Sequence, residues 1–348
     1  MATLFDRLHY RAGQTARFGV FTAAYLASRR FAPYEEAQTR EPSEGYPPPS
    51  RADLTAALQE AFTKDWQHIA EGYYRKPADL LLDPRETASR LVDYFQDLPK
   101  VTQRRKDHGH SEVLQDDLRD DYPRYYLQNF HYQSDGWLSD RSARIYDTQV
   151  DVLFTGSADA MRRLALVPLS THMRGRDQRK INVLDVACGT GRLSYFIKQN
   201  YPRVNLTSLD LSPNYLDEAR RTLQDFSRVS FLNSPVEAMP LPDASQDVVT
   251  SVYLFHELPP KIRSEAAHEI ARVLKPGGIY IHTDSIQIDD KPALNALLEH
   301  FPVAFHEPYY AGYVREDLGQ LFGEAGLAQT WTDIAFLTKS VAFQKQAS

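Results

Sequence analysis

The 348-residue chain lacks several features that mark particular classes of protein. It has one cysteine, Cys188, which excludes an internal disulfide and favours a reducing compartment. It has no apolar stretch near the roughly 18 residues that a membrane span needs, so no transmembrane segment is expected. No run of basic residues exceeds Arg104–Lys106, and the net charge at pH 7 is −6. The sequence therefore does not predict binding to nucleic acid.

The composition is that of a globular protein. Hydrophobic residues make up 42% of the chain and charged residues 25%, which is typical of soluble domains. The segment Met1–Phe31 is rich in arginine and almost free of acids, as organelle transit peptides are, but it is poor in serine. Its residues Phe18, Phe21, Tyr25 and Leu26 recur at helical spacing. We therefore expect an ordered amphipathic helix and a cytoplasmic protein, with a plastid location as the alternative.

A glycine turn follows an apolar stretch within residues 181–192. Gly189 and Gly191 let the main chain turn without a Cβ clash and bring backbone N–H groups close to a ligand. A second apolar run ends at Asp210, and a carboxylate at such a strand tip can hold both hydroxyls of a ribose. The dinucleotide fingerprint needs a third glycine where this chain has Ser194. The pattern predicts a nucleotide-type cofactor without a diphosphate.

Four motifs in a fixed order carry a resemblance to a known family: Asp185–Gly191, Leu209–Ser212, Asp247–Ser251 and Arg272–Gly278. On these residues, the stretch from about 180 to 345 resembles the class I S-adenosylmethionine-dependent methyltransferases. The branch that it resembles most includes the ubiquinone and menaquinone biosynthesis methyltransferases. The resemblance implies a doubly wound, Rossmann-like α/β sheet of seven strands that closes with a C-terminal antiparallel hairpin. The expected strands are 181–186, 204–210, 229–232, 246–252, 278–284, 332–337 and 340–343.

The resemblance also implies S-adenosylmethionine as the cofactor. The glycines then face its amino-acid part, Asp210 holds the ribose and Leu211 lies along the adenine. Where relatives often carry Asp-Ala to bind the adenine amino group, this chain has Pro235-Val236, so Asn233, Ser234 or the backbone is expected to read the base. The expected cofactor-binding residues are Asp185, Ala187, Gly189, Gly191, Asp210, Leu211, Ser234, Val236 and Tyr253.

Methyl transfer from a sulfonium needs alignment and exclusion of water rather than a metal, and no metal site is expected. Ligands in open α/β sheets bind beyond the carboxyl ends of the strands, which places His256 near the transferred methyl. A histidine with a pKa near neutrality could take a proton from the acceptor there. Alternatively, His256 and Glu257 only fasten the following loop. His131 is the second candidate for the base.

The first half of the chain reads as helical, and we divide the protein into a helical N-terminal region, 1–179, and a methyltransferase core, 180–348. Ser50 with Asp53 forms a capping box, and Asp83–Glu86 supplies a second helix start. A further helix is expected over 142–154. A proline-rich connector and a charged loop are expected at 41–49 and 104–110.

An aromatic segment without regular periodicity covers 122–136 and is followed by Trp137. It either forms the roof of an acceptor pocket or packs the helical region onto the core. An insertion over 289–323 looks like a second acceptor-side element. The expected substrate-binding residues are Tyr132, Trp137, Glu257, Tyr309, Tyr310 and Tyr313.

Together these features predict a methyltransferase that acts on a small or medium-sized organic acceptor at oxygen or carbon. The chain has no Asn/Asp-Pro-Pro-Tyr tetrapeptide after the fourth strand, which argues against methylation of nucleic acid bases. A protein methyltransferase and a non-catalytic S-adenosylmethionine-binding partner protein remain as alternatives. The sequence leaves the oligomeric state open.

Overall fold

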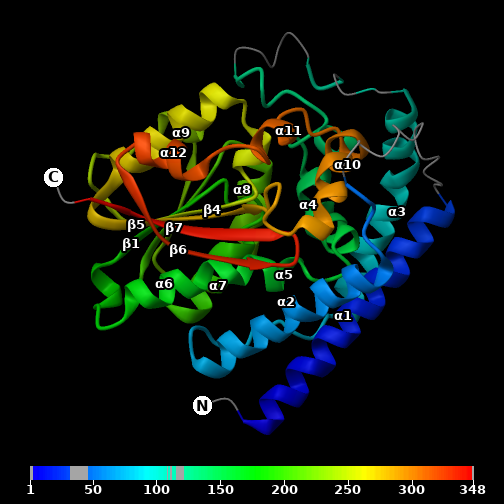
Figure 1. Ribbon diagram of the computed structural model, residues 1–348, viewed down its shortest axis with the longest axis horizontal. Helices are drawn as coiled ribbons and strands as arrows, with labels where there is room; N and C mark the ends of the chain where they lie inside the picture. The colour runs from blue at the N-terminus through cyan, green and yellow to red at the C-terminus, as the bar shows by residue number, and fades with distance from the viewer. Residues whose placement is uncertain (1–2, 32–45, 108, 110–111, 115–120, 347–348) are drawn as a thin grey trace.

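The computed structural model describes residues 3–31, 46–107, 109, 112–114 and 121–346. Its centre is a seven-stranded sheet with the strand order β3-β2-β1-β4-β5-β7-β6 (Figure 1). The first five strands are parallel, and β7 runs antiparallel to both β5 and β6. The strands are β1 (Asn182–Val186), β2 (Asn205–Asp210), β3 (Val229–Asn233), β4 (Gln246–Val252), β5 (Leu274–Ser285), β6 (Leu327–Ala335) and β7 (Thr338–Lys345).

This order confirms the predicted doubly wound sheet with its closing hairpin. The predicted boundaries of the first four strands agree with the structure to within one residue. The fifth strand begins earlier than predicted because Leu274 already pairs with Gln246 before a register shift. The hairpin strands are also longer than their apolar runs, since the ladder continues from Leu327 opposite Lys345.

Alternate side chains of the central strands enter two different cores, as strand geometry requires. Val183 packs with the helices on one face, whereas its neighbour Leu184 packs with those on the other. Figure 1 shows the two helical layers on either side of the sheet. The first face is covered by α6 (Leu166–Met173) and α7 (Arg192–Asn200), and the second by α9 (Pro260–Val273) and α12 (Leu318–Glu324).

Long helices form most of the N-terminal region and lie at one side of the sheet (Figure 1). The predicted capping box is present, with Ser50 and Asp53 bonded to each other's backbone N–H. The charged loop predicted at 104–110 is wrong up to residue 107, because Arg104 continues the helix and donates to Ser134 Oγ at 2.9 Å. The connector 41–49 lies outside the described residues up to 45. These helices are α1 (Leu4–Phe31), α2 (Arg51–Glu71), α3 (Pro84–Asp107) and α4 (Asp140–Leu153).

A buried ion pair ties these helices to the rest of the molecule. Asp65 accepts two bonds from Arg163, with Oδ1 at 3.0 Å from Nε and Oδ2 at 2.6 Å from Nη2. The hydroxyls of Tyr10 and Tyr74 donate to the same carboxylate. One hydrophobic cluster contains both Tyr10 of α1 and Val183 of β1. This cluster crosses the predicted domain boundary at residue 180. The boundary stays a prediction.

Among the described residues, no helix has the length and hydropathy to span a bilayer.

Candidate active site

The glycine turn and Asp210 are bonded to each other. The Gly189 N–H donates to Asp210 Oδ2 at 2.8 Å, and the Ser212 N–H donates to Oδ1 at 2.8 Å. Ala187 and Gly189 adopt positive φ angles of 51° and 55°, so the turn is tight on both sides of Cys188. Burial raises the pKa of Asp210 to about 6, although backbone N–H groups partly offset this effect. Each carboxylate oxygen can still accept a further bond, as a ribose hydroxyl requires.

A cavity of about 100 Å³ opens between this turn and the ends of β2 and β4. The segment 122–137 and α4 cover it, so the aromatic segment lies on the side of the sheet that the roof hypothesis requires. The cavity is lined by Tyr125, Tyr126, Phe130, Trp137, Tyr146, Ala187, Gly189, Leu209, Asp210, Leu211, Tyr215, Ser234, Pro235, Val236, Val252, Tyr253, Leu254, Glu257 and Leu258.

Trp137 is the centre of the aromatic cover. Its ring stacks on Phe130 at 5.8 Å between centroids and meets Tyr146 and Tyr215 edge-on at 5.5 and 5.6 Å. Its carbonyl accepts from Ser212 Oγ at 2.6 Å, which attaches the segment to the loop after β2. The cover is thus fastened directly beside Asp210.

Seven of the nine expected cofactor residues line the cavity, and the two that do not have different contacts. Asp185 accepts from Ser194 Oγ at 2.6 Å and from Thr250 Oγ1 at 2.9 Å. It therefore holds the start of α7 against β1 and β4, and burial raises its pKa to about 6. Gly191 has φ 82°, and a Cβ there would lie 3.2 Å from the Cβ of Ala219. A side chain at this position would therefore meet α8 (Pro213–Thr222).

His256 forms a short pair with a residue that the sequence analysis did not single out. Its Nδ1 lies 2.5 Å from Asp284 Oδ1, and Asp284 Oδ2 accepts the Phe255 N–H at 2.8 Å. Burial lowers the pKa of His256, but the charge and hydrogen bond of Asp284 outweigh burial and raise it to about 9. The expectation of a pKa near neutrality was therefore wrong, because a buried carboxylate stabilises the imidazolium.

His131, Glu257 and Glu307 meet next to this pair. His131 Nε2 lies 3.0 Å from Glu307 Oε1, and His256 Nε2 lies 3.9 Å from Glu257 Oε1. Burial, and after it the nearby Glu307, raises the pKa of Glu257 well above its usual range. Of these residues, Glu257 lines the cavity, and the others lie behind it.

Four of the expected substrate-binding tyrosines do not line the cavity. Tyr310 shares a hydrogen bond with Ser285 Oγ at 2.6 Å, and Tyr313 one with His282 Nε2 at 3.0 Å. Both rings flank His256, at 5.7 and 6.2 Å between centroids. Tyr309 and Tyr132 pack in the same region, where Tyr309 accepts from Gln128 at 3.3 Å and Tyr132 lies 5.6 Å from the ring of His306. Tyr310 and Tyr313 therefore pack around His256, whereas Tyr309 packs against the cluster of Phe130 and Trp137.

The sequence analysis missed Tyr146 and Tyr215, which stand on helices where an aromatic residue reads as core. It also missed Asp284. A signal for Asp284 existed, since it follows the apolar run of the fifth strand as Asp210 follows that of the second.

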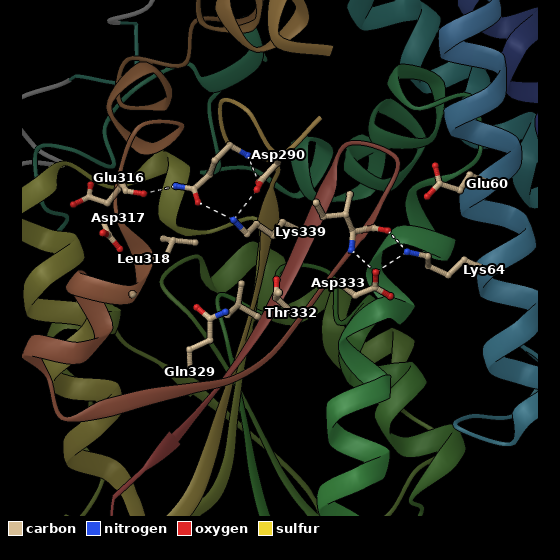
Figure 2. Close-up of a pocket in the computed structure, with 14 residues that line it drawn as sticks. Glu60, Lys64, Asp290, Glu316, Asp317, Leu318, Gln329, Thr332, Asp333 and Lys339 are labelled. Atoms are coloured by element: carbon tan, nitrogen blue, oxygen red, sulfur yellow. Dashed lines mark hydrogen bonds and ion pairs between the residues drawn. The ribbon is translucent and has the colours of Figure 1, made fainter. Parts of the chain in front are cut away.

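A larger cavity, of about 590 Å³, lies among α2, α12 and the β6–β7 hairpin (Figure 2). Its charges are paired, as the dashed lines show: Lys64 bonds Asp333 at 2.6 Å and Lys339 bonds Asp290 at 2.9 Å. None of the residues that line it belongs to the glycine turn or to the aromatic segment. We therefore place the candidate active site in the smaller cavity.

Comparison with known proteins identifies the family of the domain. The model of a methyltransferase domain matches residues 183–278, the stretch that contains all four motifs. A demethylmenaquinone methyltransferase of Listeria monocytogenes is 30% identical over 172 residues, covering 46% of this chain and 72% of that protein. A 2-methyl-6-phytyl-1,4-hydroquinone methyltransferase of Synechocystis is 34% identical over 128 residues, covering 34% of this chain and 39% of that protein. The solved 1,6-didemethyltoxoflavin-N1-methyltransferase of Burkholderia thailandensis, bound to S-adenosylhomocysteine, is similar with a TM-score of 0.41 and 19% identity, covering 58% of this chain and 84% of that one.

Proposed function

Because the chain belongs to the class I S-adenosylmethionine-dependent methyltransferases, in the branch of the ubiquinone and menaquinone biosynthesis enzymes, we propose that it methylates a small planar acceptor of the quinol or phenol type at carbon or oxygen. The observation that carries the proposal is the shared cavity of Asp210, Trp137 and Glu257. In this cavity the carboxylate of Asp210, expected to bind the nucleoside, lies beside the aromatic ring of Trp137 and the half-buried carboxyl group of Glu257. Relatives that methylate quinone precursors by name support the acceptor class.

The residues present fit the cofactor. Asp210 has free acceptor capacity on both oxygens beside the backbone of Gly189. The apolar side chains of Leu211 and Val236 line the adjoining part of the cavity, as a purine ring requires. When bound, S-adenosylmethionine supplies an electrophilic methyl group on a sulfonium. Glycine turn, carboxylate and apolar walls bind and orient it, and the aromatic cover excludes water.

The aromatic cover also suits the acceptor. A pocket for such a ligand spans roughly 300 Å³ or more, whereas the cavity has about 100 Å³. The rings of Trp137 and Phe130 therefore separate from the turn when cofactor and acceptor bind. Stacking between a planar acceptor and these rings replaces the contacts that the rings make with each other.

We assign proton removal to His256. Since Nδ1 is held by Asp284, the other ring nitrogen, Nε2, is the atom that faces Glu257 at the cavity edge. Because the pKa of His256 is about 9, its neutral form is the minor one at pH 7. That neutral form accepts the proton that leaves the acceptor hydroxyl or ring carbon. Asp284 stabilises the resulting imidazolium and holds the ring in position, the arrangement of a base and its orienting carboxylate. The bond from the Phe255 N–H to Asp284 means that the same pair also fastens the loop.

The experiment is a transfer assay with methyl-labelled S-adenosylmethionine and a panel of hydroquinones and phenols. We expect label in the organic-soluble acceptor. Label in protein would support the protein methyltransferase alternative, and binding without transfer to any class of acceptor would support the non-catalytic one. His256→Ala should lower kcat by roughly 100-fold or more with unchanged affinity for the cofactor. His268→Ala, on the exposed face of α9, is the control; an unchanged kcat in His256→Ala would remove the base assignment.

A further inference from the structure

Glu307 is a buried carboxylate that lacks the hydrogen bonds such a group normally has. It is 1% exposed, and neither of its oxygens makes a hydrogen bond of normal geometry. Among the described residues, its one side-chain ion pair is with Nε2 of His131, 3.0 Å from Oε1. Buried carboxylates are normally hydrogen-bonded on both oxygens or paired with a cation. This side chain therefore indicates a missing positive group beside it.

The surrounding ligand atoms are spaced for one shared ion. One atom each from His131, Glu257 and Glu307 lie within 4.8 Å of one another. Atoms that bind the same ion at about 2.1 Å lie roughly 3 to 4 Å apart, so small rotations of the side chains close the remaining gap. The three residues come from the aromatic segment, the loop after β4 and the insertion after β5, and they converge from distant parts of the sequence.

The local charge balance favours a dication. Two carboxylates meet in the cluster, the buried Glu307 and the half-buried Glu257, and the nearby His256 is already paired with the buried Asp284. A divalent ion would remove this excess of negative charge from the interior. One imidazole with two carboxylates suits first-row transition metals such as Mn²⁺, Fe²⁺ and Zn²⁺ better than Mg²⁺ alone.

The backbone is in the left-handed region at His131 and directly beside both His131 and Glu307. His131 and the next residue, Tyr132, both have φ 54°, and His306, next to Glu307, has φ 47°. Non-glycine residues in the left-handed region cost free energy and persist where packing over-determines them. Here the rings of Tyr132 and His306 pack at 5.6 Å, and Phe305 lies 5.8 Å from the ring of His131. This packing holds His131 and the residue before Glu307 in these conformations.

From these observations we propose that His131, Glu257 and Glu307 bind a divalent first-row transition-metal ion beside the acceptor cavity. Three protein ligands leave coordination positions open, and Glu257 places them at the cavity edge. An acceptor oxygen completes the coordination and is positioned by it, a consequence that rests on the proposed function. The ion itself is bound whether or not an acceptor is present. The expectation from sequence that the chain needs no metal is thereby revised.

The test is metal binding by the full chain, stripped with a chelator and titrated with Mn²⁺ alone. Free Mn²⁺ is followed by electron paramagnetic resonance, and Zn²⁺ binding by calorimetry. We expect one ion per chain and a rise in melting temperature. Glu307→Gln and His131→Gln should weaken binding by roughly 100-fold, because even second-shell changes cost 10- to 100-fold. Glu60→Gln, at the other cavity (Figure 2), is the matched control and should bind as the parent does, because Glu60 is half-exposed and paired with Lys291.

Several outcomes would overturn the proposal. The first is a stripped parent protein that takes up no stoichiometric Mn²⁺ or Zn²⁺ at millimolar concentration, and the second is equal affinity in parent and Glu307→Gln. A third is a metal-free protein in which Glu307→Gln raises the melting temperature and metal does not, since the two glutamates would then share a proton. If Glu307→Gln fails to fold, His131→Gln and Glu257→Gln decide. Failure of methyl transfer alone leaves the Mn²⁺ titration intact, so the two proposals fail separately.

Discussion

Asp210→Asn should separate the cofactor contacts of Asp210 from its bulk. Both oxygens of Asp210 accept backbone N–H groups at 2.8 Å, from Gly189 and Ser212. An amide keeps the size of the side chain but turns one acceptor into a donor, which must face one of these N–H groups or a ribose hydroxyl. Loss of one charge-assisted bond costs about 1.5 to 3 kcal/mol, which corresponds to roughly 10- to 150-fold in Kd. Calorimetric titration with S-adenosylhomocysteine measures this change.

The same site predicts a pH dependence. The pKa of Asp210 is raised to about 6 by burial, and the carboxylate form is the one that accepts from the ribose. Cofactor affinity should therefore be constant above pH 6 and fall about tenfold per unit below it, while Asp210→Asn flattens this slope. Without cofactor, the stability of the fold should change in the opposite direction. The pKa of Asp210 is raised on folding, so its contribution to the free energy of unfolding increases as the pH falls from 6 toward 4. Equal affinity of the parent at pH 5 and pH 7.5 would refute the assignment of Asp210.

Two further substitutions test the packing around the site. Gly191→Val should lower the free energy of unfolding by about 2 to 6 kcal/mol, from backbone strain and overpacking against Ala219 together. Gly277 has a similar φ of 75°, and a Cβ there would have no atom within 4 Å, so Gly277→Val measures the backbone strain alone. Equal losses of unfolding free energy in the two variants would contradict overpacking against Ala219. Asp65→Asn leaves the buried guanidinium of Arg163 unpaired and should cost about 3 to 5 kcal/mol in urea denaturation; a loss below 1 kcal/mol would contradict it.

The sheet was predicted in two ways: local signals placed the strands, and the resemblance to the methyltransferase family implied their order and the closing hairpin. Each strand boundary, like the glycine turn and Asp210, depends on residues within one strand and the loop that follows it. Such residues are neighbours in the sequence, so the pattern can be recognised there. The capping residues of α2 are local in the same way.

The acceptor side could not be read in this manner. Asp284 bonds His256, and Glu307 pairs with His131. The partners in each pair are far apart in the sequence, so helical or strand periodicity cannot reveal that they meet. The tyrosines after β5 were expected in the cavity because they carry polar rings. In the structure Tyr310 and Tyr313 instead pack against His256, and the cavity wall is formed by the aromatic segment, the glycine turn and the segments that follow β2, β3 and β4. Gly191 does not line the cavity, and the position that a Cβ would take there is crowded by its close neighbour Ala219, which the sequence does not reveal.

The core that Tyr10, Leu58 and Val183 share with Ile281 and Phe336 has a consequence for biosynthesis. A ribosome releases the helices of the first half long before the strands that cover their apolar faces. The nascent chain must hold this surface unpaired until β5 and the hairpin have emerged, which exposes it to aggregation and to chaperone capture. The protein's yield in a cell should then depend on the speed of translation of its last third. A truncation after β4 should precipitate rather than form a smaller folded unit.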